Sequence, residues 1–216
     1  MSETYPFTRR EIAIGGRTFT VETVDDQEAL LATASDRAIF PFGLMLWEAA
    51  IALAEEFSGR GAQIAGKSML ELGAGLGLCG VVAAALGAHV TQTDHDPATL
   101  AACARTGHLN GVTGIRCQPG DWHAWRDDAR YDFIIGADIA YDSDDHAAIL
   151  ALCQRNLGAG GTVLIADPGR ENQALFLNRA ATQGWRVRRS GRAVADLKLA
   201  VADAQINVTI IELTRA

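Results

Sequence analysis

Short apolar runs alternate along this chain with longer stretches in which apolar residues recur every three or four positions. The short runs have the length and apolar content of buried strands, and the longer stretches have the period of helices with one buried face. Strands that alternate with helices predict a parallel sheet with helices on both faces. The five predicted core strands cover residues 68–72, 88–93, 114–118, 131–137 and 162–166.

Boundary signals between these strands support the same assignment. Pro97 suits the first turn of a helix, where its missing N–H is not needed, and Asp96 before it can cap that helix. Pro41 and Gly43 interrupt the chain ahead of the first core helix. The predicted helices cover residues 44–57, 78–86, 97–110, 144–157 and 170–183, and Trp47 lies on the first of them.

Both ends of the chain add strands to this core. The Gly15-Gly16 pair between two strand-like stretches predicts an N-terminal β-hairpin, because glycine permits the positive φ angles of a tight turn. Residues 185–192 and 206–213 predict an antiparallel pair, so that one strand of the sheet is reversed. The expected fold class is therefore α/β: a doubly wound, mostly parallel, seven-stranded Rossmann-like sheet with an N-terminal β-hairpin extension.

We expect a single domain over residues 1–216, because this length suits one full core and no linker or repeat divides it. Residues 1–40 would form the extension, in which Asp25-Asp26 can cap a short helix through Ala34 after the hairpin, and residues 41–216 would form the core. No apolar run is long enough to span a bilayer, and the polar N-terminus lacks a signal-peptide core. We therefore expect a cytoplasmic protein without a membrane partner.

Composition narrows the possible partners. The chain has 49% hydrophobic residues, 21% charged residues and a formal net charge of −7, which is ordinary for a globular protein. The acidic balance argues against nucleic acid as the main partner, since phosphate binding needs a basic surface, and it permits a basic protein substrate. The four cysteines are scattered through apolar segments, so we expect buried thiols and neither a disulfide framework nor a metal site.

A glycine-rich turn after the first core strand is the most informative stretch. Gly73, Gly75 and Gly77 let the backbone turn tightly and let a ligand approach it closely. The apolar helix that follows offers unpaired N–H groups and the positive end of its dipole. Strand, turn and helix together predict a nucleotide-binding corner.

Two cofactors fit this corner. From Gly75 to Gly80 the sequence spells G-x-G-x-x-G, and Asp94 follows at the distance that a dinucleotide fingerprint requires. Glu71, at the end of the strand and facing the ligand, would repel a pyrophosphate. The same acid suits S-adenosylmethionine, which has no phosphate and carries an amino group and a sulfonium cation. The corner therefore favours S-adenosylmethionine over NAD.

Other candidates follow later strands, and ligands of open α/β sheets lie beyond the carboxyl ends of the strands. Asp94 can accept both ribose hydroxyls, although a helix cap is the alternative. Asp121 can accept from an adenine amino group while Trp122 covers the ring, with an Asx-turn as the alternative for the acid. Asp138 and Tyr141 lie three residues apart, so one turn can bring both to the pocket mouth, where the acid would hold a substrate amine. The alternative is a turn with a solvent-facing acid.

Together these stretches resemble the seven-strand S-adenosylmethionine-dependent methyltransferases, and more narrowly the group of protein-lysine methyltransferases called methyltransferase family 16. The D-x-x-Y element from Asp138 to Tyr141 is typical of the narrower group. By this resemblance Trp47, for which core packing is the alternative, would border the cofactor. The candidate cofactor-binding residues are Trp47, Glu71, Gly73, Gly75, Gly77, Asp94, Asp121, Trp122 and Asp138, and the candidate catalytic residues are Asp138 and Tyr141.

The resemblance implies a monomeric N-methyltransferase that uses S-adenosylmethionine and acts on a lysine side chain of a protein substrate. Three alternatives stay open from the sequence. They are a small-molecule amine as the substrate, an NAD-dependent oxidoreductase, and a cofactor-binding scaffold without catalysis.

Overall fold

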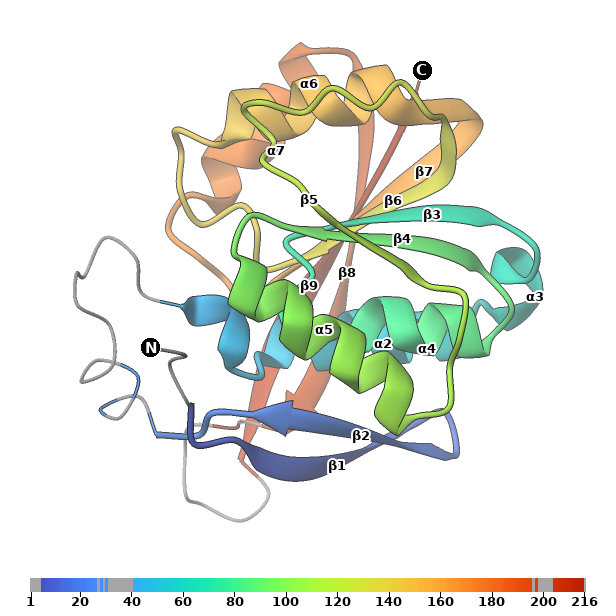
Figure 1. Ribbon diagram of the computed structural model, residues 1–216. Helices are drawn as coiled ribbons and strands as arrows, with labels where there is room; N and C mark the ends of the chain where they lie inside the picture. The colour runs from blue at the N-terminus through green and yellow to red at the C-terminus, as the bar shows by residue number, and fades with distance from the viewer. Residues whose placement is uncertain are drawn as a thin grey trace.

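The computed structural model describes residues 5–26, 28, 30, 41–195, 197 and 204–215 of the chain. A central sheet carries helices on both faces, and a two-stranded hairpin lies outside one of the helical layers (Figure 1). Most of the short helix predicted to end at Ala34 falls outside the described residues. None of the described helices combines the length and apolar composition that crossing a membrane requires.

The sheet consists of β3 (Ser68–Leu72), β4 (His89–Asp94), β5 (Arg116–Pro119), β6 (Tyr131–Ala137), β7 (Leu157–Asp167), β8 (Trp185–Ala195) and β9 (Gln205–Arg215). Their spatial order is β5-β4-β3-β6-β7-β9-β8. β3 to β7 pair in parallel, whereas β9 is antiparallel to both of its neighbours. The predicted seven-stranded, mostly parallel sheet with one reversed strand is confirmed.

Helices α2 (Glu48–Ser58), α4 (Leu78–Ala85) and α5 (Pro97–Leu109) cover one face of the sheet, and α6 (His146–Asn156) and α7 (Gln173–Thr182) cover the other (Figure 1). The Asp96 carboxylate caps α5, as predicted, by accepting from the N–H groups of Ala98 and Thr99, each at 3.1 Å. The 3-10 turn η2 (Phe42–Leu44) precedes α2, and the short helix α3 (Gly61–Ile64) follows α2.

The prediction that the first core helix begins at residue 44 and carries Trp47 is wrong. Phe42–Leu44 forms the 3-10 turn, Met45 is extended, and Trp47 occupies the N-cap of α2 in an extended conformation (φ −111°, ψ 144°). Tertiary contacts explain the break, because the Leu44 carbonyl accepts from the Val24 N–H and the Leu46 N–H donates to Thr23 Oγ1, both at 2.9 Å. The backbone of these residues is thus bonded to the end of β2 and its following residue.

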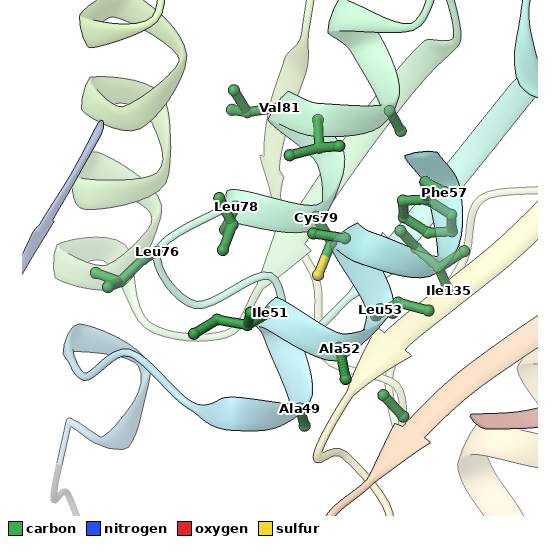
Figure 2. Packing of buried hydrophobic residues seen from close by; sticks show 14 of the residues in the cluster. Ala49, Ile51, Ala52, Leu53, Phe57, Leu76, Leu78, Cys79, Val81 and Ile135 are labelled. Carbon is green, nitrogen blue, oxygen red and sulfur yellow. The ribbon is translucent and has the colours of Figure 1, made fainter. Parts of the chain in front are cut away.

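Two hydrophobic clusters fill the spaces on either side of the sheet. Figure 2 shows part of the first, where Leu53 and Phe57 of α2 lie near Ile135 of β6, while Val81 of α4 lies farther away in the same cluster. All four side chains are fully buried. This packing fixes the start of α4, and with it the glycine-rich turn that precedes that helix.

The predicted N-terminal hairpin is present as β1 (Thr8–Ile14) and β2 (Arg17–Thr23), joined by the two glycines at positive φ. Its Phe19 is buried in the same cluster as α2 and α4. Asn110, at the end of α5, accepts from the N–H of Thr20 (2.8 Å) and donates to its carbonyl (2.7 Å). The hairpin is thus bonded to the helical layer as well as packed on it.

Candidate active site

The carboxyl ends of four neighbouring parallel strands meet at one edge of the sheet, where α/β proteins bind their ligands. β4 ends at Asp94, β7 ends at Asp167, and Asp138 follows β6 directly. The Asp138 N–H donates to the carbonyl of Ala166 at 2.8 Å, which ties the loop after β6 to the end of β7. Three carboxylates therefore lie along this edge of the sheet.

The glycine-rich turn has the left-handed backbone that its sequence predicts. φ is 57° at Gly73, 55° at Gly75 and 79° at Gly77, which is the N-cap of α4 and supplies no side-chain cap. A Cβ atom would lie 3.3 Å from the Gly43 carbonyl at Gly75 and 2.6 Å from the Cys103 Sγ at Gly77. The N-cap glycine thus has no side chain to accept from the first N–H groups of α4, which can attract a ligand there, although the Gly80 N–H among them donates to the Glu71 side chain.

Glu71 does not face the ligand edge, and that prediction is wrong. Its side chain is buried beneath the turn, where Oε2 accepts from the Gly80 N–H (3.0 Å) and from Gln92 Nε2 (2.7 Å). Burial raises the pKa of the carboxyl from 4.5 to about 7, against the lowering effect of these two hydrogen bonds. Glu71 therefore supports the glycine-rich turn from inside the protein.

Asp94 lies directly against the turn. Its Oδ2 accepts from the Gly75 N–H and its Oδ1 from the Asp96 N–H, both at 3.1 Å. Burial raises the pKa of this carboxyl, and the two backbone hydrogen bonds oppose the rise. Because Asp96 caps α5, the cap alternative for Asp94 fails, and its carboxylate holds the turn at the place predicted for the ribose.

Asp121 and Trp122 lie at the end of β5. Asp121 is exposed, and its Oδ1 accepts from the N–H of His123 (2.9 Å), so the predicted Asx-turn is formed. The Trp122 ring approaches within 3.6 Å of the position that a Cβ atom on Gly73 would take, and Ile139 approaches within 2.9 Å. The structure thus brings Trp122 to the glycine-rich turn.

Asp138 adopts the one positive φ (55°) of any non-glycine residue in the described part of the chain. Such a conformation is costly and is often found at functional sites. The carboxylate is not solvent-facing, since only 8% of the side chain is exposed, and Oδ1 accepts from Arg170 Nε at 2.9 Å. A second guanidinium nitrogen donates to Oδ2, which makes the pair bidentate.

Arg170 and Asp167 belong to the site and were not predicted from the sequence. The fully buried Asp167 accepts from the N–H groups of Gly169 (2.7 Å) and Arg170 (2.9 Å) and from Gln173 Nε2 (2.7 Å). The same strand-end rule that selected Asp94 would have found Asp167, which ends β7. The partner of Arg170 lies 32 residues away, and no local sequence signal indicates that distance.

Trp47 also reaches this cluster. The Arg170 guanidinium lies 5.6 Å from the centroid of its ring, within the range of a cation–π contact, and its Nε1 donates to the Phe42 carbonyl at 3.0 Å. The side chain is half-buried and is not part of the hydrophobic clusters among the described residues. The core-packing alternative for Trp47 is therefore wrong.

Tyr141 borders the site, although the helical turn expected to bring it there does not form. Its side chain is half-exposed, and Asn172 Nδ2 donates to its carbonyl at 2.7 Å. Burial is the largest cause that raises the pKa of its hydroxyl, and the carboxylates of Asp145, Asp142, Asp138 and Asp94 add to the rise. The Tyr141 hydroxyl thus lies within the electrostatic influence of Asp138 and Asp94.

His146, a further residue that sequence reasoning missed, fixes the loop between Asp138 and Tyr141. The imidazole is fully buried, with Nε2 at 2.8 Å from the Ala140 carbonyl and the ring 5.1 Å from that of Phe176 in α7. This anchor holds the loop against the helical layer.

Comparison with known proteins agrees with this arrangement. A family model described as "Lysine methyltransferase" matches residues 26–183, nearly three quarters of the chain. The chain belongs to the lysine methyltransferase family. The match begins near the end of the hairpin and runs through α7, so it includes every candidate site residue, and the resemblance inferred from the sequence is confirmed.

Individual relatives and solved structures extend the comparison. EEF1A lysine methyltransferase 3 of Mus musculus is 30% identical over 173 residues, which cover 76% of this chain and 69% of that protein. Protein N-lysine methyltransferase METTL21A of Danio rerio is 36% identical over 128 residues, covering 56% of this chain and 58% of that protein. The T. thermophilus 16S rRNA N2 G1207 methyltransferase RsmC, in complex with AdoMet and guanosine, shares the fold, with a TM-score of 0.63 and 17% identity over 97% of this chain and 51% of that chain.

Proposed function

We propose that this member of the lysine methyltransferase family transfers a methyl group from S-adenosylmethionine to the side-chain nitrogen of a lysine in a protein substrate. The observation that carries the proposal is the strained Asp138, which follows β6 at the strand ends and is paired with Arg170, whose guanidinium lies over the Trp47 ring. The relatives named as lysine methyltransferases support the choice of acceptor.

The residues at the turn fit S-adenosylmethionine. The start of α4 has no side-chain cap, each Asp94 oxygen keeps acceptor capacity beyond its one backbone partner, and Trp122 flanks Gly73. Asp94 would bind the ribose, Trp122 would cover the adenine, and Asp121 would accept from its amino group. The buried Glu71 no longer argues against a pyrophosphate, so the preference over NAD now depends on the family.

Bound S-adenosylmethionine supplies a methyl group that is already activated by the sulfonium. The protein must therefore orient the acceptor and exclude water, which effectively lowers the barrier to transfer. A free lysine amine has a pKa of about 10.4, so the site must also favour the neutral form. Asp138 would accept a hydrogen bond from the amine, and Tyr141 would line its path.

An apolar rim favours a protein as the substrate over a small molecule. Among the described residues, the exposed large hydrophobic side chains are Phe42, Tyr141 and Leu175. Phe42 adjoins Trp47, with ring centroids 6.3 Å apart, and Leu175 lies one turn into α7 from Asn172, which bonds the Tyr141 backbone. Exposed apolar groups at the mouth of a site suit contact with a macromolecule.

The first test concerns the cofactor. Asp94→Asn should lower the affinity for S-adenosylmethionine by roughly tenfold or more in calorimetric titration, because the ribose loses a charged acceptor. Asp96→Asn is the matched control, since asparagine caps a helix as well as aspartate does and should leave the affinity unchanged. Binding of NAD, with none of S-adenosylmethionine, would instead support an oxidoreductase.

The second test follows the methyl group. The protein should transfer label from S-adenosylmethionine to a protein in a cell lysate, and mass spectrometry should locate the label on lysine. Asp138→Asn and Tyr141→Phe should each cut kcat by about tenfold or more with cofactor affinity nearly intact, as expected for contacts made in the transition state. A labelled small molecule would replace the protein-lysine assignment, and binding without any transfer would favour a scaffold.

A further inference from the structure

Acidic groups surround the place proposed for the acceptor amine. Asp94, Asp138, Asp142 and Asp145 act electrostatically on the Tyr141 hydroxyl. Asp138, Asp167 and Glu48, at the start of α2, act on the Arg170 guanidinium. Such a ring of carboxylates would hold a lysine as its ammonium, which cannot accept a methyl group.

Most of these carboxylates accept donors of their own. Asp94 and Asp167 accept from backbone N–H groups, and so does Asp142, from Asp144 at 2.9 Å. Asp145 lies 2.7 Å from His123 Nε2, and that contact raises the pKa of the exposed imidazole. Glu48 accepts from the Leu197 N–H at 3.1 Å.

Asp138 instead accepts its hydrogen bonds from a side chain that carries a full positive charge. The planar Arg170 guanidinium presents two donors to the two oxygens of the carboxylate. The backbone N–H of Arg170 donates to Asp167, and the Arg170 guanidinium also lies over the Trp47 ring. The arginine is thus held from three directions, with its charge directed at Asp138.

We propose that Arg170 is a positioning residue that cancels the charge of Asp138, so that the acceptor lysine loses its proton to water before the methyl transfer. The inference rests on the proposed function. Without Arg170, the Asp138 carboxylate would attract the ammonium form and raise the pKa of the acceptor. With Arg170, the same carboxylate can accept a hydrogen bond from the neutral amine without holding an additional proton on it.

The pH dependence of kcat/KM for the labelled protein substrate tests this role. Arg170→Gln should move the acidic limb of the profile upward by about one pH unit. At pH values below the limb, kcat/KM should therefore be about tenfold lower than in the unchanged protein, and at high pH this difference should disappear. Arg170→Lys keeps the charge and should keep the limb near its original position. Asp138→Asn leaves Arg170 unopposed and should move the limb to lower pH, whatever its effect on the maximum rate.

The double variant Arg170→Gln with Asp138→Asn should return the limb to its original position, because neither charge is left. Arg192→Gln is the matched control, since it removes an arginine of the edge strand β8 that is paired with Glu56, and not with Asp138, at similar exposure. Thermal unfolding and cofactor titration show whether each variant is folded and loaded.

A loss that is the same at every pH would overturn the inference and make Arg170 a structural residue, while leaving the proposed function intact. An acidic limb that stays at its original pH in both Arg170→Gln and Asp138→Asn would overturn the inference as well. Absence of transfer by the unchanged protein, despite cofactor binding, would overturn the proposed function and with it this role of Arg170.

Discussion

Burial sets the chemistry of Glu71 more strongly than its hydrogen bonds do. The Gly80 N–H and the Gln92 amide both favour the charged carboxylate, yet its pKa rises from 4.5 to about 7. Loss of water around the side chain is the largest cause. A residue that reads as a ligand contact in the sequence is instead a titrating group inside the fold.

This shift predicts a pH-dependent stability. The folded protein holds the Glu71 proton more tightly than the unfolded chain, so the free energy of unfolding should fall as pH rises from about 4.5 to about 7. The full shift corresponds to ~3 kcal/mol. Glu71→Gln should flatten this dependence in urea unfolding series at pH 5 and pH 8. The exposed Glu11→Gln should leave it unchanged, and an equally steep fall in the Glu71→Gln variant would contradict the account.

At the scale of single elements, the strands and most helices could be predicted because their apolar period is local. The start of α2 could not, because the backbone ahead of it is set by its hydrogen bonds to Thr23 and Val24. Likewise, residues 158–161 lie between the predicted helix over 144–157 and the predicted strand over 162–166, but they extend β7 at its start. Contacts between elements set the local structure at both places, and such contacts leave no periodic signal in the sequence.

Two glycines inside helices allow the effect of helix propensity on stability to be distinguished from the effect of packing. Alanine is favoured over glycine inside a helix by ~1 kcal/mol. In α4, however, a Cβ atom on Gly80 would lie 2.5 Å from both Glu71 Oε2 and Gln92 Nε2, two buried atoms that are bonded to each other. Gly80→Ala should therefore destabilise the protein by about 1–3 kcal/mol in urea unfolding.

Gly107→Ala in α5 is the matched control. The nearest atom to its added Cβ would be the Val112 carbonyl oxygen at 3.5 Å, an ordinary contact, so this variant should gain about 0.5–1 kcal/mol. Equal effects of the two substitutions would mean that the Glu71–Gln92 pair can shift aside.

Across the whole molecule, the rule that ligands bind at the carboxyl ends of strands selected Asp94, Asp138 and Tyr141 as candidate residues from the sequence alone. It did not reveal that Asp138 is paired, because Arg170 follows a different strand and meets it only in the folded chain. Nor did it show which way Glu71 points, since both faces of a central strand are buried and the sequence pattern does not distinguish them.

The hairpin tests whether the chain unfolds as one unit. Phe19 is buried among residues of α2 and α4, and Arg17 Nη1 donates to the Ala85 carbonyl at the end of α4 (3.1 Å). Phe19→Ala should therefore destabilise the whole protein by roughly 3–5 kcal/mol and lower Tm by about 10 °C. The exposed Thr18→Ala should change neither.

Tryptophan fluorescence makes this prediction sharp, because every tryptophan of the chain lies outside the hairpin, at Trp47, Trp122, Trp125 and Trp185. If the hairpin and the sheet form one cooperative unit, Phe19→Ala must shift the fluorescence transition as far as the far-ultraviolet circular dichroism transition. If the hairpin unfolds separately, fluorescence stays at its original midpoint while circular dichroism shows an earlier step. The burial of Phe19 in the same hydrophobic cluster as residues of α2 and α4 leads us to expect coincident transitions.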